Sequence, residues 1–251
     1  MKVNQMRSGP FLITRILGSV ALFLIFASLG GDLMQFFQGS DNDYVKTLFP
    51  LFDLDEEYNV PTYFSVMLMI FAALLLAAIA ILAGKRQHSD ISKWALLAAG
   101  FLCMAYDEVF MVHERLIHPI RAIWGKSSLG IFYYAWVIPG VALVFFLGLF
   151  FLKFLLRLPK STRFTFIAAA SLYLGGSIGF EFIGGWYAEL NGTAGLTYNA
   201  ITTLEESLEM AGLIVFIDAL LAYLVGNFGE IKFRPLRWSE EKPNFDPGVS
   251  V

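Results

Sequence analysis

Long runs of apolar residues alternate with short polar segments along most of the chain. Six of these runs are long enough to cross the hydrocarbon core of a bilayer, which takes about 20 apolar residues in a helix. They cover residues of about 12–30, 62–84, 94–117, 131–152, 164–188 and 198–224. The pattern predicts an all-α, polytopic membrane protein with six transmembrane helices.

The composition agrees with this prediction and excludes a soluble globular domain. Hydrophobic residues make up 57% of the chain and the mean hydropathy is +0.64, whereas roughly half of the residues of a soluble domain are apolar. The first run lacks a small-residue cleavage site, so we expect it to remain as a span. Residues 1–225 then form a single membrane domain, and the polar, proline-bearing residues 226–251 form a flexible cytoplasmic tail.

Basic residues predict the orientation, because lysine and arginine near spans stay on the cytoplasmic side. Of the 18 basic residues, 14 fall at the two termini and in the connections near 85–93 and 153–163. We therefore expect both termini to be cytoplasmic and the protein to lie in the cell membrane. Trp94, Trp136 and Trp186 stand near the predicted span ends, where we expect interfacial aromatic residues.

Three of the six predicted spans carry acidic residues at positions that should lie in hydrocarbon. An acid there costs about 2.5–3.5 kcal/mol on the insertion scale and usually faces the interior of a helix bundle. At about 1.5 Å per residue, all of these acids except Asp218 reach overlapping depths in the outer half of the membrane, and Asp218 lies apart near the cytoplasmic end of its span. They are Asp107, Glu108 and Glu114 in 94–117, Glu181 in 164–188, and Glu205, Glu206, Glu209 and Asp218 in 198–224.

Helical phase predicts which acids of the span 94–117 share a face. In a continuous helix Asp107, Met111 and Glu114 lie on one face, and Glu108 and Arg115 lie on another, where they could pair. His113 points elsewhere. His118 would return to the Asp107 face, although it precedes Pro119 and could already be outside the helix.

The other two acidic spans have comparable faces. Glu205 and Glu209 are stacked in 198–224, with Glu206 at their edge. In 164–188 the small residues Ser177 and Gly185 line up with Glu181, a spacing that allows close helix contact in lipid.

So many buried acids need either protons or cations to balance their charge. Carboxylates on facing helices together with histidine are the ligands of di-iron and di-manganese bundle sites, although the usual Glu-x-x-His pair is absent. The predicted site binds a divalent metal such as iron, manganese or zinc, with Glu108 and Glu206 as catalytic proton carriers. Its candidate ligands are Asp107, His113, Glu114, His118, Glu181, Glu205 and Glu209. The alternatives are a protonated acid network and polar pairing between helices.

Two further stretches have structural explanations as well as functional ones. "FDLDEEYNVP" at 52–61 begins like a calcium loop, but Tyr58 and Phe64 occupy positions that need glycine and glutamate, so a solvated acidic loop over the outer mouth of the site is favoured. "GGSIG" at 175–179 matches the letters of a nucleophile elbow, but inside a membrane helix its glycines favour packing.

The stretches "FDLDEEYNVPTYFS", "DEVFMVHERL", "GFEFIGGWYAEL" and "TTLEESLEMAG" resemble those of a bacterial family of uncharacterised multi-spanning membrane proteins. The resemblance covers nearly the whole chain and includes the intramembrane patterns DExxxxHE and EExxE. It implies a six-helix integral membrane protein and carries no established activity.

Three functions are compatible with these observations. The first is a metal-dependent membrane enzyme that acts on a lipid or quinone-like substrate from the outer leaflet, because the acids occupy only one half of the membrane. The second is a proton- or cation-coupled transporter, and the third is a structural or assembly protein. The expected partners are the bilayer and a lipid-like small molecule, and we expect no nucleic acid.

Overall fold

The described chain is helical throughout. The computed structural model describes residues 8–39, 42–85, 90–124 and 129–229, and no strand occurs among them. In order, the elements are α1 (Ser8–Gln38), α2 (Asp43–Thr47), the 3₁₀-helix η1 (Phe49–Leu51), α3 (Val60–Lys85), α4 (Ile91–Phe110), α5 (Val112–Arg115), α6 (Ile117–Trp124), the 3₁₀-helix η2 (Gly130–Phe132), α7 (Val137–Arg157), α8 (Lys160–Leu174), the π-helix η3 (Gly175–Phe180), α9 (Glu181–Asn191) and α10 (Leu196–Phe228).

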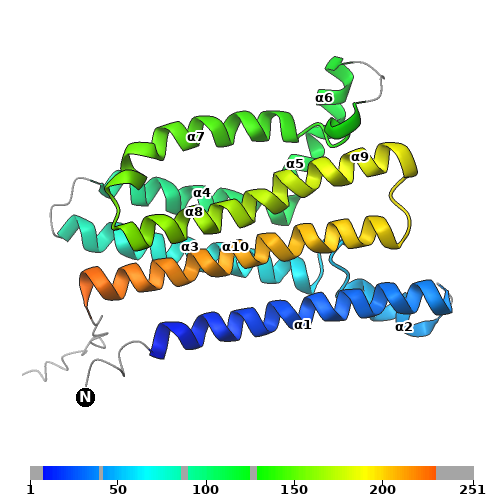
Figure 1. The fold of residues 1–251 in the computed structure, drawn as a ribbon, viewed down its shortest axis with the longest axis horizontal. Coiled ribbons are helices and arrows are strands. Elements are labelled where there is room, and N and C mark those ends of the chain that lie inside the picture. The colour runs from blue at the N-terminus through cyan, green and yellow to red at the C-terminus, as the bar shows by residue number, and fades with distance from the viewer. Residues whose placement is uncertain (1–7, 40–41, 86–89, 125–128, 230–251) are drawn as a thin grey trace, which may run out of the picture.

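These helices confirm an all-α, multi-pass membrane protein. Five segments of the described chain are long and apolar enough to cross a membrane: Leu12–Gln38, Val60–Lys85, Val137–Arg157, Lys160–Asn191 and Leu196–Phe228. A sixth span exists only if the bent pair Ile91–Phe110 and Val112–Ile123 is counted as one. The N-terminal end of α1 and the C-terminal end of α10 lie at the same end of the bundle (Figure 1).

The prediction of one continuous helix over 94–117 is wrong, because the chain turns sharply at Met111. Met111 has a left-handed backbone, with φ 48° and ψ 46°, and the two flanking helical pieces meet at 66°. The helical phase therefore cannot be extended past residue 111. The shared face of Asp107 and Glu114 and the expected pairing of Glu108 with Arg115 both depended on that continuity, so neither prediction holds.

Helix α1 continues beyond its predicted end at residue 30. The continuation carries Asp32, which is only 4% exposed and accepts a hydrogen bond from the side-chain amide of Asn199 on α10 at 2.6 Å. Gly31 allows Phe49 to pack against the helix, since a Cβ there would lie 1.8 Å from the Phe49 ring. These contacts extend the helix to Gln38.

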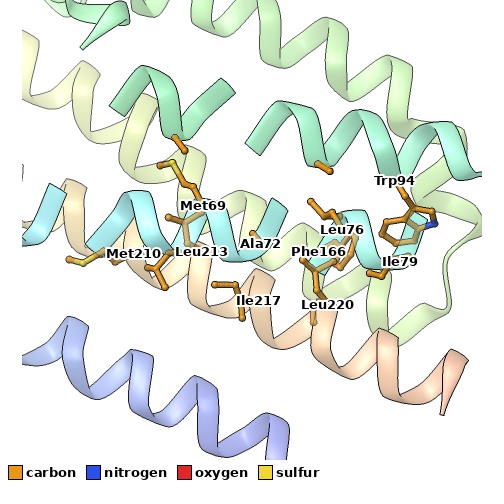
Figure 2. Close-up of a cluster of buried hydrophobic side chains, with 14 of the residues drawn as sticks. Met69, Ala72, Leu76, Ile79, Trp94, Phe166, Met210, Leu213, Ile217 and Leu220 are labelled. Atoms are coloured by element: carbon orange, nitrogen blue, oxygen red, sulfur yellow. The ribbon is translucent and has the colours of Figure 1, made fainter. Parts of the chain in front are cut away.

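The core lies between α3 and α10, and α10 also packs against α1 and α8. Figure 2 shows the side chains of the two central helices facing one another, with Trp94 and Phe166 closing one end. Trp94 is 1% exposed and packs edge-on against Phe154 with ring centroids 4.8 Å apart. Trp94 thus lies near a helix end, as expected, but it faces the core of the protein.

Two glycines bring α8, η3 and α10 close together. A Cβ on Gly212 would lie 2.6 Å from the backbone nitrogen of Tyr173, and one on Gly176 would lie 2.6 Å from the carbonyl oxygen of Glu205. A close contact was predicted along the line of Ser177 and Gly185. Gly185 has one, since a Cβ there would lie 3.2 Å from Tyr133 Cβ and 3.4 Å from the Ile131 carbonyl oxygen. Ser177 instead bonds within its own helix, to the Tyr173 carbonyl at 3.1 Å.

The acidic loop between α1 and α3 is packed onto the bundle and is not simply solvated. The backbone N–H of Leu54 donates to the buried Ser28 hydroxyl at 3.1 Å, and the Asn59 amide donates to the Pro50 carbonyl at 3.2 Å. Phe49 and Leu54 are 3% and 6% exposed. The loop thus covers the end of the bundle that is remote from the two chain ends.

The predicted tail begins too early. Helix α10 continues to Phe228 and ends with Gly229 at a φ of 75°. The rest of the predicted cytoplasmic tail lies outside the described residues.

Candidate functional site

Helix α7 lies over α4 and α8 (Figure 1). Near its C-terminal end Phe154 packs on Trp94 of α4, and α7 also contacts η3. Beneath α7 lies a cavity of about 990 Å³, whose other walls come from α4, α8, η3 and α10. Pockets for small ligands commonly measure about 300–1,000 Å³. The cavity is therefore large enough for a whole small molecule.

The two ends of this cavity differ in chemistry. Towards the chain ends, the lining is apolar and consists of residues such as Leu97, Phe101, Phe151, Phe154, Leu155, Phe166 and Phe216. At the opposite end, beneath the acidic loop, the lining carries Asp55, Asp107, Glu108, His113, Glu114, Tyr134, Trp136, Glu181, Tyr198, Thr202, Glu205, Glu206 and Glu209. A long, apolar molecule with one polar end matches this division.

The break at Met111 positions a histidine against an aspartate. His113 donates its backbone N–H to Asp107 Oδ1 at 2.9 Å, and its ring Nδ1 lies 2.8 Å from Asp107 Oδ2. The carboxylate therefore satisfies a backbone donor that the interrupted helix leaves free, and it fixes the orientation of the imidazole ring. Such a dyad can exchange protons with a bound molecule through the other ring nitrogen.

A second carboxyl group is held from α7 and α10 together. The indole N–H of Trp136 donates to Glu181 Oε1 at 2.6 Å, and the Trp136 ring packs edge-on against His113 with centroids 4.8 Å apart. Glu181 is also hydrogen-bonded to Glu205. Since an ionised carboxylate only accepts hydrogen bonds, this contact requires a proton shared between the two acids.

Two tyrosines and one loop acid close the polar end. The hydroxyl groups of Tyr134 and Tyr198 hydrogen-bond to each other. Burial raises the pKa of Tyr134 to about 12, so its hydroxyl stays protonated at neutral pH. Asp55 hydrogen-bonds to Thr202. Burial, together with the charges of neighbouring acids, raises the pKa of Asp55 to about 7.

The remaining acids differ in how they are satisfied. Glu209 accepts a hydrogen bond from the hydroxyl group of Tyr173. Among the described residues, neither Glu108 nor Glu206 has a hydrogen-bond partner for its carboxyl group. Both line the cavity, so their polar atoms remain available to a bound molecule.

The structure brings eight of the nine predicted site residues together at the cavity wall: Asp107, Glu108, His113, Glu114, Glu181, Glu205, Glu206 and Glu209. His118 is separate, because it lies on α6 beyond the break, is exposed, and does not line the cavity. Sequence reasoning placed Thr202 on the helix face of Glu205 and Glu209, but it missed Asp55, Tyr134, Trp136, Tyr173 and Tyr198. Their signal was weak, since tyrosine and tryptophan near span ends usually mark the membrane interface.

The carboxyl groups line the cavity without converging on one point. In the described parts of the chain, no three histidine, cysteine, aspartate or glutamate side chains are grouped so that they could hold a metal ion. The predicted ligand set of Asp107, His113, Glu114, His118, Glu181, Glu205 and Glu209 therefore has no support from the side-chain arrangement. The metal remains a prediction.

Comparison with known proteins gives a family without an assigned activity. No curated protein and no solved structure matches the chain. The family model DUF8692, described as a domain of unknown function, matches residues 16–224. That range includes the cavity and all of its acids, and the chain belongs to the DUF8692 family.

Proposed function

We propose that the protein is a membrane enzyme that binds a lipid-like or quinone-like amphiphile in the cavity beneath α7 and acts on its polar end. The observation that carries the proposal is the continuity of one cavity from an apolar end to an end lined by acids, a histidine and tyrosines. A scaffold that only pairs helices has no need of such a space. An alkyl chain gains about 0.8 kcal/mol per CH₂ group when it leaves water. A chain that enters from lipid has no such gain, so binding from the bilayer depends on contacts at the polar end.

In this proposal the polar residues supply acid–base chemistry. Asp107 orients His113 through Nδ1, and the other ring nitrogen exchanges a proton with the bound molecule. The proton shared by Glu181 and Glu205 makes that pair a donor. Glu108 and Glu206, which have no partner among the described side chains, act as the proton carriers that link the dyad to the pair.

The orientation is part of the proposal. We place both termini in the cytoplasm because seven of the ten basic residues in the described ranges lie towards the end of the bundle where α1 begins and α10 ends. The acidic end of the cavity then faces the outer leaflet of the cell membrane. A substrate would enter laterally from that leaflet, past α7.

A divalent ion of iron, manganese or zinc is an optional element of the proposal. The acids would have to move towards one another to hold it. Elemental analysis of protein purified without chelator tests this element: one or two equivalents that are lost in Glu205→Ala would support a metal-dependent enzyme. Metal content that is the same in the variant and the wild type would remove the metal from the proposal.

Two cavity glycines provide a direct test of substrate binding. Gly100 on α4 and Gly148 on α7 line the cavity, and a Cβ on either would meet no atom within 4 Å. Phenylalanine at these positions therefore fills the cavity without displacing a helix. Gly18→Phe is the matched control, since Gly18 on α1 is also unobstructed and lies outside the cavity.

The experiment uses a long-chain alcohol with a diazirine in its alkyl chain, added to the purified protein in lipid nanodiscs. We expect photolabelling of α4 and α7 in the wild type and in Gly18→Phe, and its loss in Gly100→Phe and Gly148→Phe. Equal labelling of the cavity helices in all four proteins would contradict the proposal. Turnover is then sought by mass spectrometry of membrane lipid extracts incubated with the wild type and with His113→Gln.

The transporter and assembly alternatives make different predictions. A proton- or cation-coupled transporter requires a polar route to the cytoplasmic end, where the described cavity lining is apolar. It would show proteoliposome uptake that Glu181→Gln abolishes. An assembly protein would retain a partner subunit through its acids, and Glu205→Gln would reduce that retention without affecting amphiphile labelling.

A further inference from the structure

The cavity is lined by more carboxylic acids than the described basic residues around it can pair with. Eight carboxylic acids line it, and within the described ranges neither a lysine nor an arginine does. Two of the basic residues near its ends are engaged elsewhere: Arg157 pairs with Asp90, and Arg121 lies 3.9 Å from Glu189. His113 is the one lining side chain that can become cationic, and it is already bonded to Asp107.

Glu206 is a second, independent indication of a ligand. This side chain is mostly buried but keeps some accessible surface, and no described residue forms a hydrogen bond with its carboxyl group. Its remaining accessible surface faces the cavity. Leaving a buried polar group without a partner is costly. A ligand that contacts Glu206 would remove that cost, whereas an empty or purely apolar cavity would not.

Aromatic residues at the same end suit an organic cation. Trp136, Tyr134 and Tyr198 line the cavity next to the acids. Aromatic faces attract an ammonium group within about 6 Å and are the usual means of recognising quaternary ammonium ligands. An anionic head such as a phosphate would meet eight acids and no lysine or arginine, which opposes its binding.

A metal ion fits these observations less well than an organic cation does. Metal sites need several ligands that converge on one point, and no such group exists among the described side chains. An ammonium head attached to an alkyl chain needs no convergence, because it can contact carboxylates and ring faces on several sides. The apolar half of the cavity accounts for the chain.

We propose that the occupant of the cavity is a cationic amphiphile. Four observations support this proposal: the acids outnumber the described basic residues around the cavity, Glu206 has no partner among the described residues, aromatic residues lie beside the acids, and the rest of the cavity is apolar. The polar group of the amphiphile is a primary amine or a quaternary ammonium, placed between Glu206, Glu108 and the aromatic residues around Trp136. This inference rests on the proposed function, because it assigns a substrate class to the same cavity.

The test compares three photoactivatable probes with the same diazirine-bearing alkyl chain and different heads: trimethylammonium, hydroxyl and phosphate. Labelling is measured on the purified full-length protein in nanodiscs of neutral lipid. The amount of probe attached to α4 and α7 is divided by the amount attached to the exposed face of α1. This ratio corrects for partitioning of each probe into the lipid. We expect half-maximal labelling by the trimethylammonium probe at a concentration at least about tenfold lower than that of the hydroxyl probe.

Glu206→Gln and Glu108→Gln test the assigned contact. These isosteric changes remove a carboxylate and keep the side-chain shape. We therefore expect the ratio of the half-maximal concentration of the hydroxyl probe to that of the trimethylammonium probe to fall towards one. Circular dichroism and the melting temperature of each variant, compared with those of the wild type, show whether the protein is still folded. Retention of the wild-type ratio in both variants would contradict the inference.

The outcomes separate this inference from the proposed function. Equal or stronger labelling by the hydroxyl or phosphate probe would overturn the cationic assignment and leave amphiphile binding in place. Absence of cavity labelling by all three probes would overturn both.

Discussion

His113 contacts both oxygens of the Asp107 carboxylate, through its backbone N–H at 2.9 Å and its ring Nδ1 at 2.8 Å. The backbone contact compensates the donor that the helix loses at Met111. The ring contact orients a proton-exchanging group towards the cavity. One carboxylate thus stabilises an unusual backbone turn and, in the proposed function, orients the imidazole for proton exchange.

Asp107→Asn should therefore affect stability as well as activity. An amide presents only one acceptor oxygen, so the variant cannot accept both hydrogen bonds. We expect the free energy of unfolding to fall by about 1 to 2 kcal/mol, a moderate value because the carboxylate is partly exposed. Chemical unfolding in mixed micelles measures this change. Asp43→Asn, at an exposed loop acid, is the control, and an equal loss in both variants would argue against the role given to Asp107.

Gly212→Ala should destabilise the crossing of α8 and α10. The added methyl group would lie 2.6 Å from the Tyr173 nitrogen and 2.9 Å from the Ala169 carbonyl oxygen, and neither backbone atom can move without separating the helices. Overpacking of this kind costs about 1–3 kcal/mol. The same unfolding measurement checks it against Gly226→Ala, where nothing lies within 4 Å. A tolerated Gly212→Ala would mean that the helices can separate freely.

Raising the pH should weaken the packing of the acidic loop. Burial and neighbouring charges raise the pKa of Asp55 to about 7 and the pKa of Asp53 to about 6. The folded protein therefore binds more protons than the unfolded chain between about pH 4 and pH 7, and the stability that these two acids contribute falls as the pH rises through that window. Above pH 7 the slope should flatten.

Melting temperatures measured from pH 4.5 to pH 8 in the wild type and in Asp55→Asn test the assignment. The variant cannot ionise at residue 55, so we expect its melting temperature to vary less with pH over this range. Asp43→Asn should keep the wild-type slope. An identical slope in Asp55→Asn and the wild type would show that other groups determine the pH dependence.

The sequence predicts the spans well because hydrophobic length is a local property. Val60–Lys85 and Leu196–Phe228 lie within a few residues of the predicted ranges. The break at Met111 was missed because neither glycine nor proline marks it. A methionine in a left-handed conformation is costly on its own, and the compensation comes from Asp107 and His113 in a geometry that exists only after folding.

The site was predicted only in part, because some of its signals are local in the sequence and others depend on tertiary contacts. Acids in hydrocarbon signal an interior face wherever they occur, which correctly grouped Glu181 with Glu205. Helical phase could not place His118, which follows the break. The role of Trp136 as a donor to Glu181 is a tertiary contact between residues that are 45 positions apart, and no local pattern encodes it.

The attachment of α7 at its two ends leads to the last prediction. At the outer end Trp136 donates to Glu181, and at the other end Arg157 pairs with Asp90. Between these contacts α7 borders the cavity and exposes residues such as Leu143 and Phe146 at 60% and 66%. We expect this helix to be the part of the wall that moves when an amphiphile enters.

Arg157→Gln should loosen the C-terminal end of α7 and leave the outer end unchanged, whereas Trp136→Phe should do the opposite. Because each change removes one partly exposed contact, amide hydrogen exchange in the adjoining turns should accelerate about three- to tenfold. Hydrogen exchange in nanodiscs, followed by mass spectrometry, resolves the two ends of the helix. Lys160→Gln, at an exposed residue just after α7, is the control. If either variant accelerated exchange along all of α7, the helix would move as one rigid unit, and entry past a flexible middle section would be wrong.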